Sequence, residues 1–129
     1  MNIRILNEGD AQSYQKVRLS ALKNNPEAFG STYEREVKFS LATVKERIAP
    51  STNHFVLGAF DDACSLIGIV TFMREIGIKM RHKGNVFGMY VAPENRGQGV
   101  SKLLLTELIR MAKNCDGLEQ LNLAVVSDN

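Results

Sequence analysis

Several residue types are scarce in this chain, and each shortage excludes a class of protein. There is no tryptophan, and there are only two cysteines and three prolines in 129 residues. Cys64 and Cys115 do not form a CxxC pair, and neither has a histidine at metal-ligand spacing. A disulfide framework and a metal site are therefore not expected. We expect two free thiols, buried or half-buried, in a reducing compartment.

Long apolar runs and strong charge are also missing. No window approaches the roughly 18 apolar residues that a membrane-spanning helix needs. The N-terminus has no basic segment followed by an apolar one, so no signal peptide is expected. The net charge of +2 is too small to favour nucleic-acid binding. These absences favour a cytoplasmic protein with no nucleic-acid or membrane partner. A chain of 129 residues, 44% of them hydrophobic, is long enough for one domain with its own core.

The spacing of apolar residues predicts a mixed chain of strands and helices. Alternation predicts strands, and helical spacing predicts helices. The expected strands cover 2–6, 54–60, 65–76, 86–91 and 118–126, and the expected helices cover 11–24, 41–49 and 101–114. The polar segment 27–40 predicts a loop with at most one helical turn. Asp10 is expected to cap the first helix, Gly68 to mark a bulge or a close backbone approach, and Gly117 to lie near the C-cap of the last helix.

The predicted element order is β-α-α-β-β-β-α-β, in a single domain over residues 1–129. Three successive strands with short connections should pair antiparallel, and the last strand, after a crossover helix, should lie parallel to the strand before that helix. The expected fold class is therefore α/β (α+β), with a mixed, mostly antiparallel sheet and flanking helices.

A glycine-rich turn, RGQGVS at residues 96–101, joins a predicted strand to a predicted helix. The first turn of a helix carries unpaired N–H groups and the positive end of the helix dipole. Gly97 and Gly99 have no side chain to keep a ligand away, and Arg96 adds charge, so the turn suits phosphate or pyrophosphate. It lacks the Gly-Lys-Ser/Thr of a Walker A loop, and Lys102 stands where a dinucleotide fingerprint needs glycine. An ordinary surface turn remains an alternative for an isolated G-x-G.

With its flanks, the stretch MYVAPENRGQGVSKLLL resembles the acetyl-CoA binding motif of the GNAT N-acetyltransferase superfamily, Gln/Arg-x-x-Gly-x-Gly/Ala. Arg96, Gly99 and Ser101 take the three defined positions, and Ser101 departs from the usual Gly or Ala. The resemblance covers essentially all 129 residues. It implies the GNAT fold, acetyl-CoA as acetyl donor, and transfer of the acetyl group to a small-molecule or peptide amine.

The resemblance also implies a cofactor site along the fourth strand and the turn. Pantetheine would pair with the backbone of Met89 and Val91, and a backbone N–H in that stretch would stabilise the oxyanion. The Tyr90 side chain would line the substrate site or belong to the core. The implied cofactor-binding residues are Met89, Tyr90, Val91, Arg96, Gly97, Gln98, Gly99, Val100, Ser101, Lys102 and Asn129.

Several residues are candidates for the catalytic base and for the pocket that binds the acceptor amine. Asn85 stands where some members carry a glutamate base, so Glu75, His82 or a water relay are the candidates for deprotonating the amine. In the family the acceptor pocket draws on the first helix, the loop after it and the hairpin before the fourth strand. Here those segments contain Phe29, Tyr33, Glu34, Glu36, Arg81, His82 and Lys83. Glu34 and Glu36 would attract a cationic amine, or would simply be part of a solvated charged loop.

The resemblance ends with Asn129, which matches an asparagine that precedes an acid tyrosine in many members. The helix and strands that follow in the family are expected to be missing. The exposed last strand then favours pairing with another chain, as in a homodimer. The alternative to an enzyme is a non-catalytic acyl-CoA-binding or interaction module.

Overall fold

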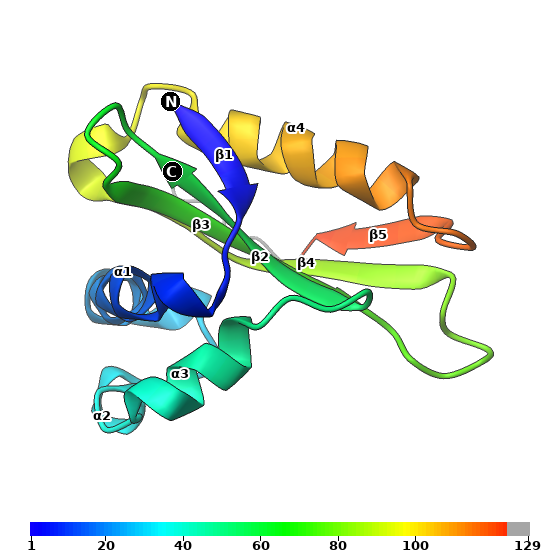
Figure 1. Ribbon diagram of the computed structural model, residues 1–129, viewed down its shortest axis with the longest axis horizontal. Helices are drawn as coiled ribbons and strands as arrows, with labels where there is room; N and C mark the ends of the chain where they lie inside the picture. The colour runs from blue at the N-terminus through cyan, green and yellow to red at the C-terminus, as the bar shows by residue number, and fades with distance from the viewer. Residues whose placement is uncertain (124–129) are drawn as a thin grey trace.

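The computed structural model describes residues 1–123, which form a five-stranded sheet with helices on both faces (Figure 1). The strands are β1 (Asn2–Ile5), β2 (His54–Phe60), β3 (Leu66–Arg74), β4 (Lys83–Val91) and β5 (Gln120–Leu123). The helices are α1 (Ala11–Asn24), α2 (Tyr33–Glu36), α3 (Leu41–Ile48) and α4 (Val100–Lys113), with short 3-10 turns η1 (Glu8–Asp10), η2 (Pro26–Ala28) and η3 (Pro93–Asn95).

The sheet has the predicted mixed topology. Its order is β1-β2-β3-β4-β5, and the first four strands are antiparallel to their neighbours. β5 follows the crossover helix α4 and lies parallel to β4, in a register that runs from Lys83 opposite Gln120 to Val86 opposite Leu123. The fold class predicted from periodicity is confirmed.

Helices cover the two faces of the sheet unequally (Figure 1). α4 lies alone on one face, where its buried residues Leu104, Leu108 and Ala112 pack with Val70 and Phe72 of β3. α1 and α3 cover part of the other face. Each helix buries one apolar stripe, which is the main source of helix stability in a small domain.

Gly68 marks the predicted close approach. A Cβ atom there would lie 3.1 Å from side-chain atoms of both Val100 and Leu104, and 3.4 Å from the carbonyl oxygen of Tyr90. The register between β2 and β3 also shifts beside this residue. Glycine therefore lets α4 sit close to β3, just where the helix begins.

Two local predictions were wrong. Asp10 occupies the N-cap position of α1 but makes no capping hydrogen bond to that helix. Its carboxylate instead pairs with Arg4 at 2.8 Å and accepts a hydrogen bond from the Asn7 N–H, because a cation within reach competes with the helix amides. Cys64 is exposed rather than buried, while Cys115 is half-buried, and both thiols are free.

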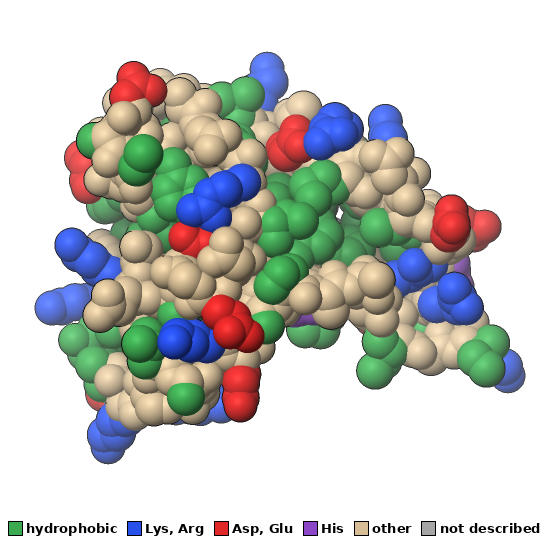
Figure 2. All heavy atoms as spheres, viewed as in Figure 1, with side chains coloured by type: hydrophobic (Ala, Val, Ile, Leu, Met, Phe, Trp, Pro, Cys, Tyr) green, Lys and Arg blue, Asp and Glu red, His purple; other side chains and the backbone are tan. Residues whose placement is uncertain are grey.

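The connection between β3 and β4 projects from the body of the molecule. Its apolar side chains include Ile76 and Ile78, which are 83% and 91% exposed, and Figure 2 shows hydrophobic and basic side chains together on this projection. The surface is hollowed between the projection and the part of the molecule that holds α1, α2 and α3. Within residues 1–123, no helix has the length and apolar character to cross a membrane.

Candidate functional site

The glycine-rich turn has an open, left-handed backbone. Gly97 and Gly99 have φ angles of 79° and 78°, a region that side chains other than glycine rarely adopt. A Cβ atom at either position would meet nothing within 4 Å. Gly99 is the N-cap residue of α4, so this open backbone leads directly into the first turn of the helix.

This turn presents a row of unpaired N–H groups. The first backbone hydrogen bond into α4 runs from the Leu103 N–H to the Gly99 carbonyl at 3.1 Å. From Gly97 to Lys102, no backbone N–H donates a hydrogen bond to another described residue. Such groups at the positive end of a helix of this length are suited to an anion.

The Arg96 side chain ties the turn to β4 and to the segment after α1. Its Nε donates to the Val91 carbonyl at 3.0 Å, and its Nη2 donates to Asn25 Oδ1 at 3.2 Å. Its guanidinium lies 5.4 Å from the centre of the Tyr90 ring. In this arrangement the open side of the site is built by backbone N–H groups rather than by the arginine side chain.

Tyr90 belongs to the core, which was one of its two predicted alternatives. Its side chain is buried against Ile69. Its hydroxyl lies 3.2 Å from Ser20 Oγ and accepts a hydrogen bond from Asn24 Nδ2 at 3.1 Å. These contacts tie the end of β4 to α1, and Ser20 and Tyr90 also line a cavity of about 590 Å³ between α1 and the end of β4.

A bulge interrupts β4 beside the predicted cofactor strand. Ile69 pairs with Tyr90 and Thr71 with Phe87, so Gly88 and Met89 together stand opposite the single residue between them on β3. Gly88 has a φ angle of 65°, as the first residue of this kind of bulge often does. The sequence prediction placed Gly88 inside an uninterrupted strand, although an isolated glycine in a strand pattern is itself a bulge signal.

A cavity of about 300 Å³ opens on the side of the sheet that carries α1 and α3. It is lined by Tyr14, Arg18, Arg47, His54, Val56, Thr71, Met73 and Phe87. The cavity adjoins the bulge, because a Cβ atom at Gly88 would lie 3.8 Å from Arg18 Nη1 and 3.5 Å from Thr71 Oγ1. We call it the arginine pocket.

A buried ion-pair cluster forms one wall of the arginine pocket. The Glu36 side chain is 0% exposed. Arg18 donates to both of its carboxylate oxygens at 3.0 and 3.1 Å, and Arg47 Nη1 donates to it at 2.9 Å. Each arginine also stacks on a phenylalanine, Arg18 on Phe29 at 4.7 Å and Arg47 on Phe39 at 5.0 Å.

Burial raises the pKa of Glu36, but hydrogen bonds from Arg18, Ser31 and Arg47 outweigh it and lower that pKa to about 2. Glu36 is therefore ionised at neutral pH. Both predictions for it were wrong: it is not a solvated loop residue, and it is not free to attract an amine. Glu34 is exposed, as a solvated residue would be.

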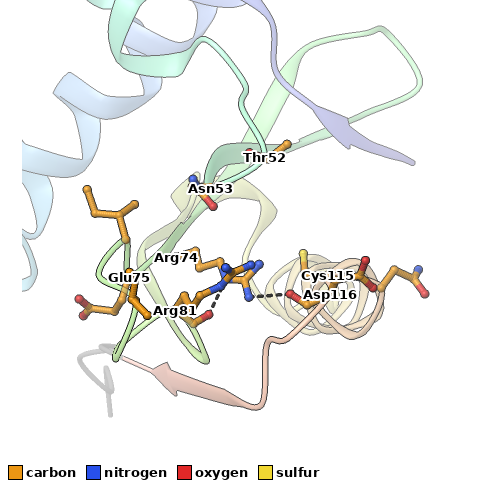
Figure 3. Close-up of a pocket in the computed structure, with 10 residues that line it drawn as sticks. Thr52, Asn53, Arg74, Glu75, Arg81, Cys115 and Asp116 are labelled. Carbon is orange, nitrogen blue, oxygen red and sulfur yellow. Dashed lines mark hydrogen bonds between the residues drawn. The ribbon is translucent and has the colours of Figure 1, made fainter.

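The other predicted acceptor residues do not come together. Phe29 lies under Arg18, whereas Tyr33 and Glu34 line one separate cavity together with Lys23. Arg81 lines a third cavity, of about 670 Å³ (Figure 3). There the buried Arg74 donates to the backbone carbonyls of Arg81 and Asp116, which ties the β3–β4 connection to the turn after α4.

The candidate bases lie near the start of β4. Glu75 Oε1 accepts a hydrogen bond from Asn85 Nδ2 at 3.0 Å, and Asn85 Oδ1 accepts one from Asn122 Nδ2 at 3.4 Å. The His82 carbonyl accepts the N–H groups of Glu119 and Gln120, which anchors the segment that leads into β5. Asn129 lies outside the described residues.

His54, which the sequence prediction treated only as part of a strand, is the imidazole in the arginine pocket. Burial lowers its pKa, against a smaller opposing effect from a hydrogen bond with the Ala49 backbone. A neutral imidazole is therefore favoured at this position.

Comparison with known proteins gives a consistent family. The model of the acetyltransferase (GNAT) family matches residues 15–129. A GNAT acetyltransferase from Streptococcus pneumoniae is similar in structure, with a TM-score of 0.79 at 22% identity, covering 95% of this chain and 72% of that one. A ribosomal-protein-alanine N-acetyltransferase from Brucella melitensis biovar Abortus gives 0.70 at 23% identity, over 95% and 77%.

AAC(6')-Iy, in complex with the bisubstrate analogue CoA-S-monomethyl-acetylneamine, gives a TM-score of 0.70 at 19% identity, over 99% of this chain and 81% of that one. At these identities the likeness shows the fold alone. The search of curated proteins found no match.

Proposed function

The chain belongs to the acetyltransferase (GNAT) family, and from this premise we propose that it is a cytoplasmic enzyme that moves an acetyl group from acetyl-CoA to a primary amine by direct attack. The observation that carries the proposal is the row of unpaired N–H groups from Gly97 to Lys102. Acetyl-CoA would supply an activated thioester and a pyrophosphate by which it is held. The residues fit it, because Gly97 and Gly99 leave the approach to those N–H groups clear.

Each part of the site has a distinct task in this proposal. The N–H groups from Gly97 to Lys102 hold the pyrophosphate, and the backbone of Met89 and Val91 holds pantetheine as an added strand would. A backbone N–H near Met89 stabilises the negative charge that develops on the carbonyl oxygen. The amine nitrogen bonds to the carbonyl carbon, the C–S bond breaks, and the thiolate leaves and takes up a proton.

The amine must be neutral when it attacks, so its proton needs an acceptor. Glu75, the residue that follows β3, is held in place by Asn85 of β4, and we propose that it accepts the proton through water. His82 is the second candidate from the sequence. His54 in the arginine pocket is a third, which only the structure brings forward.

One observation favours a second candidate function, a non-catalytic acyl-CoA-binding module. Asn85, at the position where some family members carry a glutamate base, is an amide whose hydrogen bonds go to Glu75 and Asn122. A chain that binds acetyl-CoA but releases no free CoA with any amine would fit that reading.

Calorimetry with CoA tests the shared part of both proposals. A side chain at Gly99 would strain a left-handed backbone by roughly 1–2 kcal/mol and would occupy the approach to the N–H groups. Gly99→Val should therefore weaken CoA binding by at least about tenfold. Gly30→Val is the matched control, since a Cβ there also meets nothing within 4 Å and its φ angle is not left-handed.

Wild-type chain that does not bind CoA, or Gly99→Val that binds it as tightly as wild type, would refute the proposed site. Release of free thiol from acetyl-CoA in the presence of a panel of amines then separates the enzyme from the binding module.

A further inference from the structure

The arginine pocket lies where an acceptor amine would have to enter, and this inference rests on the proposed function. The pyrophosphate site at Gly97–Lys102 and the predicted pantetheine strand at Met89–Val91 lead back along β4 toward Gly88. The pocket begins beside that residue, where Arg18 Nη1 and Thr71 Oγ1 approach the bulge.

The pocket carries an excess of positive charge. The cluster on its wall has two guanidinium groups, Arg18 and Arg47, and one carboxylate, Glu36. The side chains of Arg18 and Arg47 are only 12% and 35% exposed. No Asp or Glu lines the pocket among the described residues. The two guanidinium groups share the single carboxylate of Glu36, and an added carboxylate would balance the remaining positive charge.

Some guanidinium nitrogens of Arg18 and Arg47 are not used in the hydrogen bonds to Glu36. Arg18 uses Nε and Nη2 on Glu36, and Arg47 uses Nη1. Within residues 1–123, no acceptor is bound to Arg18 Nη1 or to Nε and Nη2 of Arg47. A guanidinium with free planar donors is the side chain best suited to bind a carboxylate.

The remaining titratable groups of the pocket add no negative charge. Burial raises the pKa of Tyr14, which leaves its phenol neutral, and His54 is favoured as neutral imidazole. Nearby cations also lower the pKa of an incoming ammonium group, which favours the neutral amine that the reaction needs. The same field opposes an acceptor with several positive charges.

We propose that the acceptor is a small primary amine that carries a carboxylate, as an amino acid does, with the carboxylate on Arg18 and Arg47 and the amine directed toward Gly88. The volume of about 300 Å³ lies at the lower end for ligand pockets, which agrees with a molecule of this size.

Matched pairs of amines test the proposal. The CoA-bound chain is titrated in a calorimeter with glycine and glycinamide, with phenylalanine and phenylalaninamide, and with kanamycin as a polycationic amine. Each acid should bind about tenfold or more tightly than its amide, since the amide keeps the amine but loses the charged hydrogen bonds. Rates of thiol release from acetyl-CoA should follow the same order.

Variants then assign the effect to the pocket. Arg47→Gln should reduce the preference for acid over amide toward unity, and Arg47→Lys should retain part of it. Arg35→Gln is the matched control, because Arg35 also lies over Phe39, at 5.7 Å, but is exposed and does not line the pocket. Far-UV circular dichroism checks that each variant is folded.

The outcomes separate the two proposals. Normal CoA binding with equal affinity for acids and amides, with no binding of either, or with preference for kanamycin, overturns the carboxylate proposal alone. A preference for acids that survives in Arg47→Gln also overturns it. Failure to bind CoA overturns the proposed function and this inference together.

Discussion

The glycine-rich turn and the arginine pocket lie at opposite ends of the Gly88–Val91 stretch of β4, yet one is formed by backbone groups and the other by side chains. The turn uses the backbone N–H groups of consecutive residues, which donate to no other described residue. The pocket uses side chains from helices and strands that are distant in sequence, held around the buried Glu36. One site follows from a local sequence, and the other exists only in the folded chain.

The difference has an energetic consequence. Solvent-exposed N–H groups at a helix end cost little before a ligand arrives, because water satisfies them. Buried charges are costly unless each has a partner. We therefore expect changes in the turn to alter mainly ligand binding, and removal of the buried Glu36 carboxylate to alter mainly stability.

Removing the buried carboxylate should have the largest effect. Glu36→Ala leaves Arg18 and Arg47 without their partner, and breaking a buried ion pair in this way costs about 3–5 kcal/mol. Urea unfolding followed by far-UV circular dichroism measures it. Glu34→Ala, at an exposed position two residues away, should change stability by about 0.5 kcal/mol or less. Similar losses in both variants would show that the cluster does not differ from its surroundings.

Lowering the pH should remove part of the same stabilisation. The pKa of Glu36 falls from 4.5 to about 2 on folding, so its contribution is complete above pH 4.5 and is lost as the pH falls toward 2. The shift corresponds to about 3 kcal/mol. Unfolding free energies measured between pH 6 and pH 2.5 should show this loss.

Asp10→Asn serves as the control for the pH experiment, since Asp10 also has a lowered pKa, caused first by its hydrogen bond with Arg4, but lies outside the pocket. That variant should keep most of the acid sensitivity. If it removes the sensitivity instead, the surface pair rather than the buried cluster controls acid unfolding.

The two sites also differ in how far the sequence predicted them. RGQGVS predicted the open turn that we propose as the anion site, because the relevant residues are adjacent and glycine has a known conformational role. Gly88 carried a readable bulge signal that the strand pattern obscured. The sequence around Glu36 gave no signal that it is buried, since a glutamate in a polar segment looks the same whether solvent or two arginines surround it. Only tertiary contacts between α1, α2 and α3 decide that.

The fold itself was largely predictable, because most helix boundaries follow local rules. Pro26 and Pro50 each lie two residues beyond the last residue of α1 and α3, as expected from the conformational limits on the residue before a proline. Asp10 shows where local rules fail: Arg4, on the neighbouring strand, takes the carboxylate that the helix would have used.

The smallest expected effect concerns the contact that joins the two regions. The Tyr90 hydroxyl bonds to Ser20 and Asn24 of α1, the helix that also carries Arg18. Tyr90→Phe removes these bonds without changing the ring, and should cost about 1 kcal/mol. Tyr33→Phe is the matched control, because its ring contact with Lys23 does not need the hydroxyl, so its stability should stay within about 0.5 kcal/mol of wild type.

If β4 and α1 are coupled through Tyr90, Tyr90→Phe should also weaken CoA binding slightly, by less than Gly99→Val does. Unchanged stability and CoA affinity in Tyr90→Phe would show that the turn and the pocket are independent.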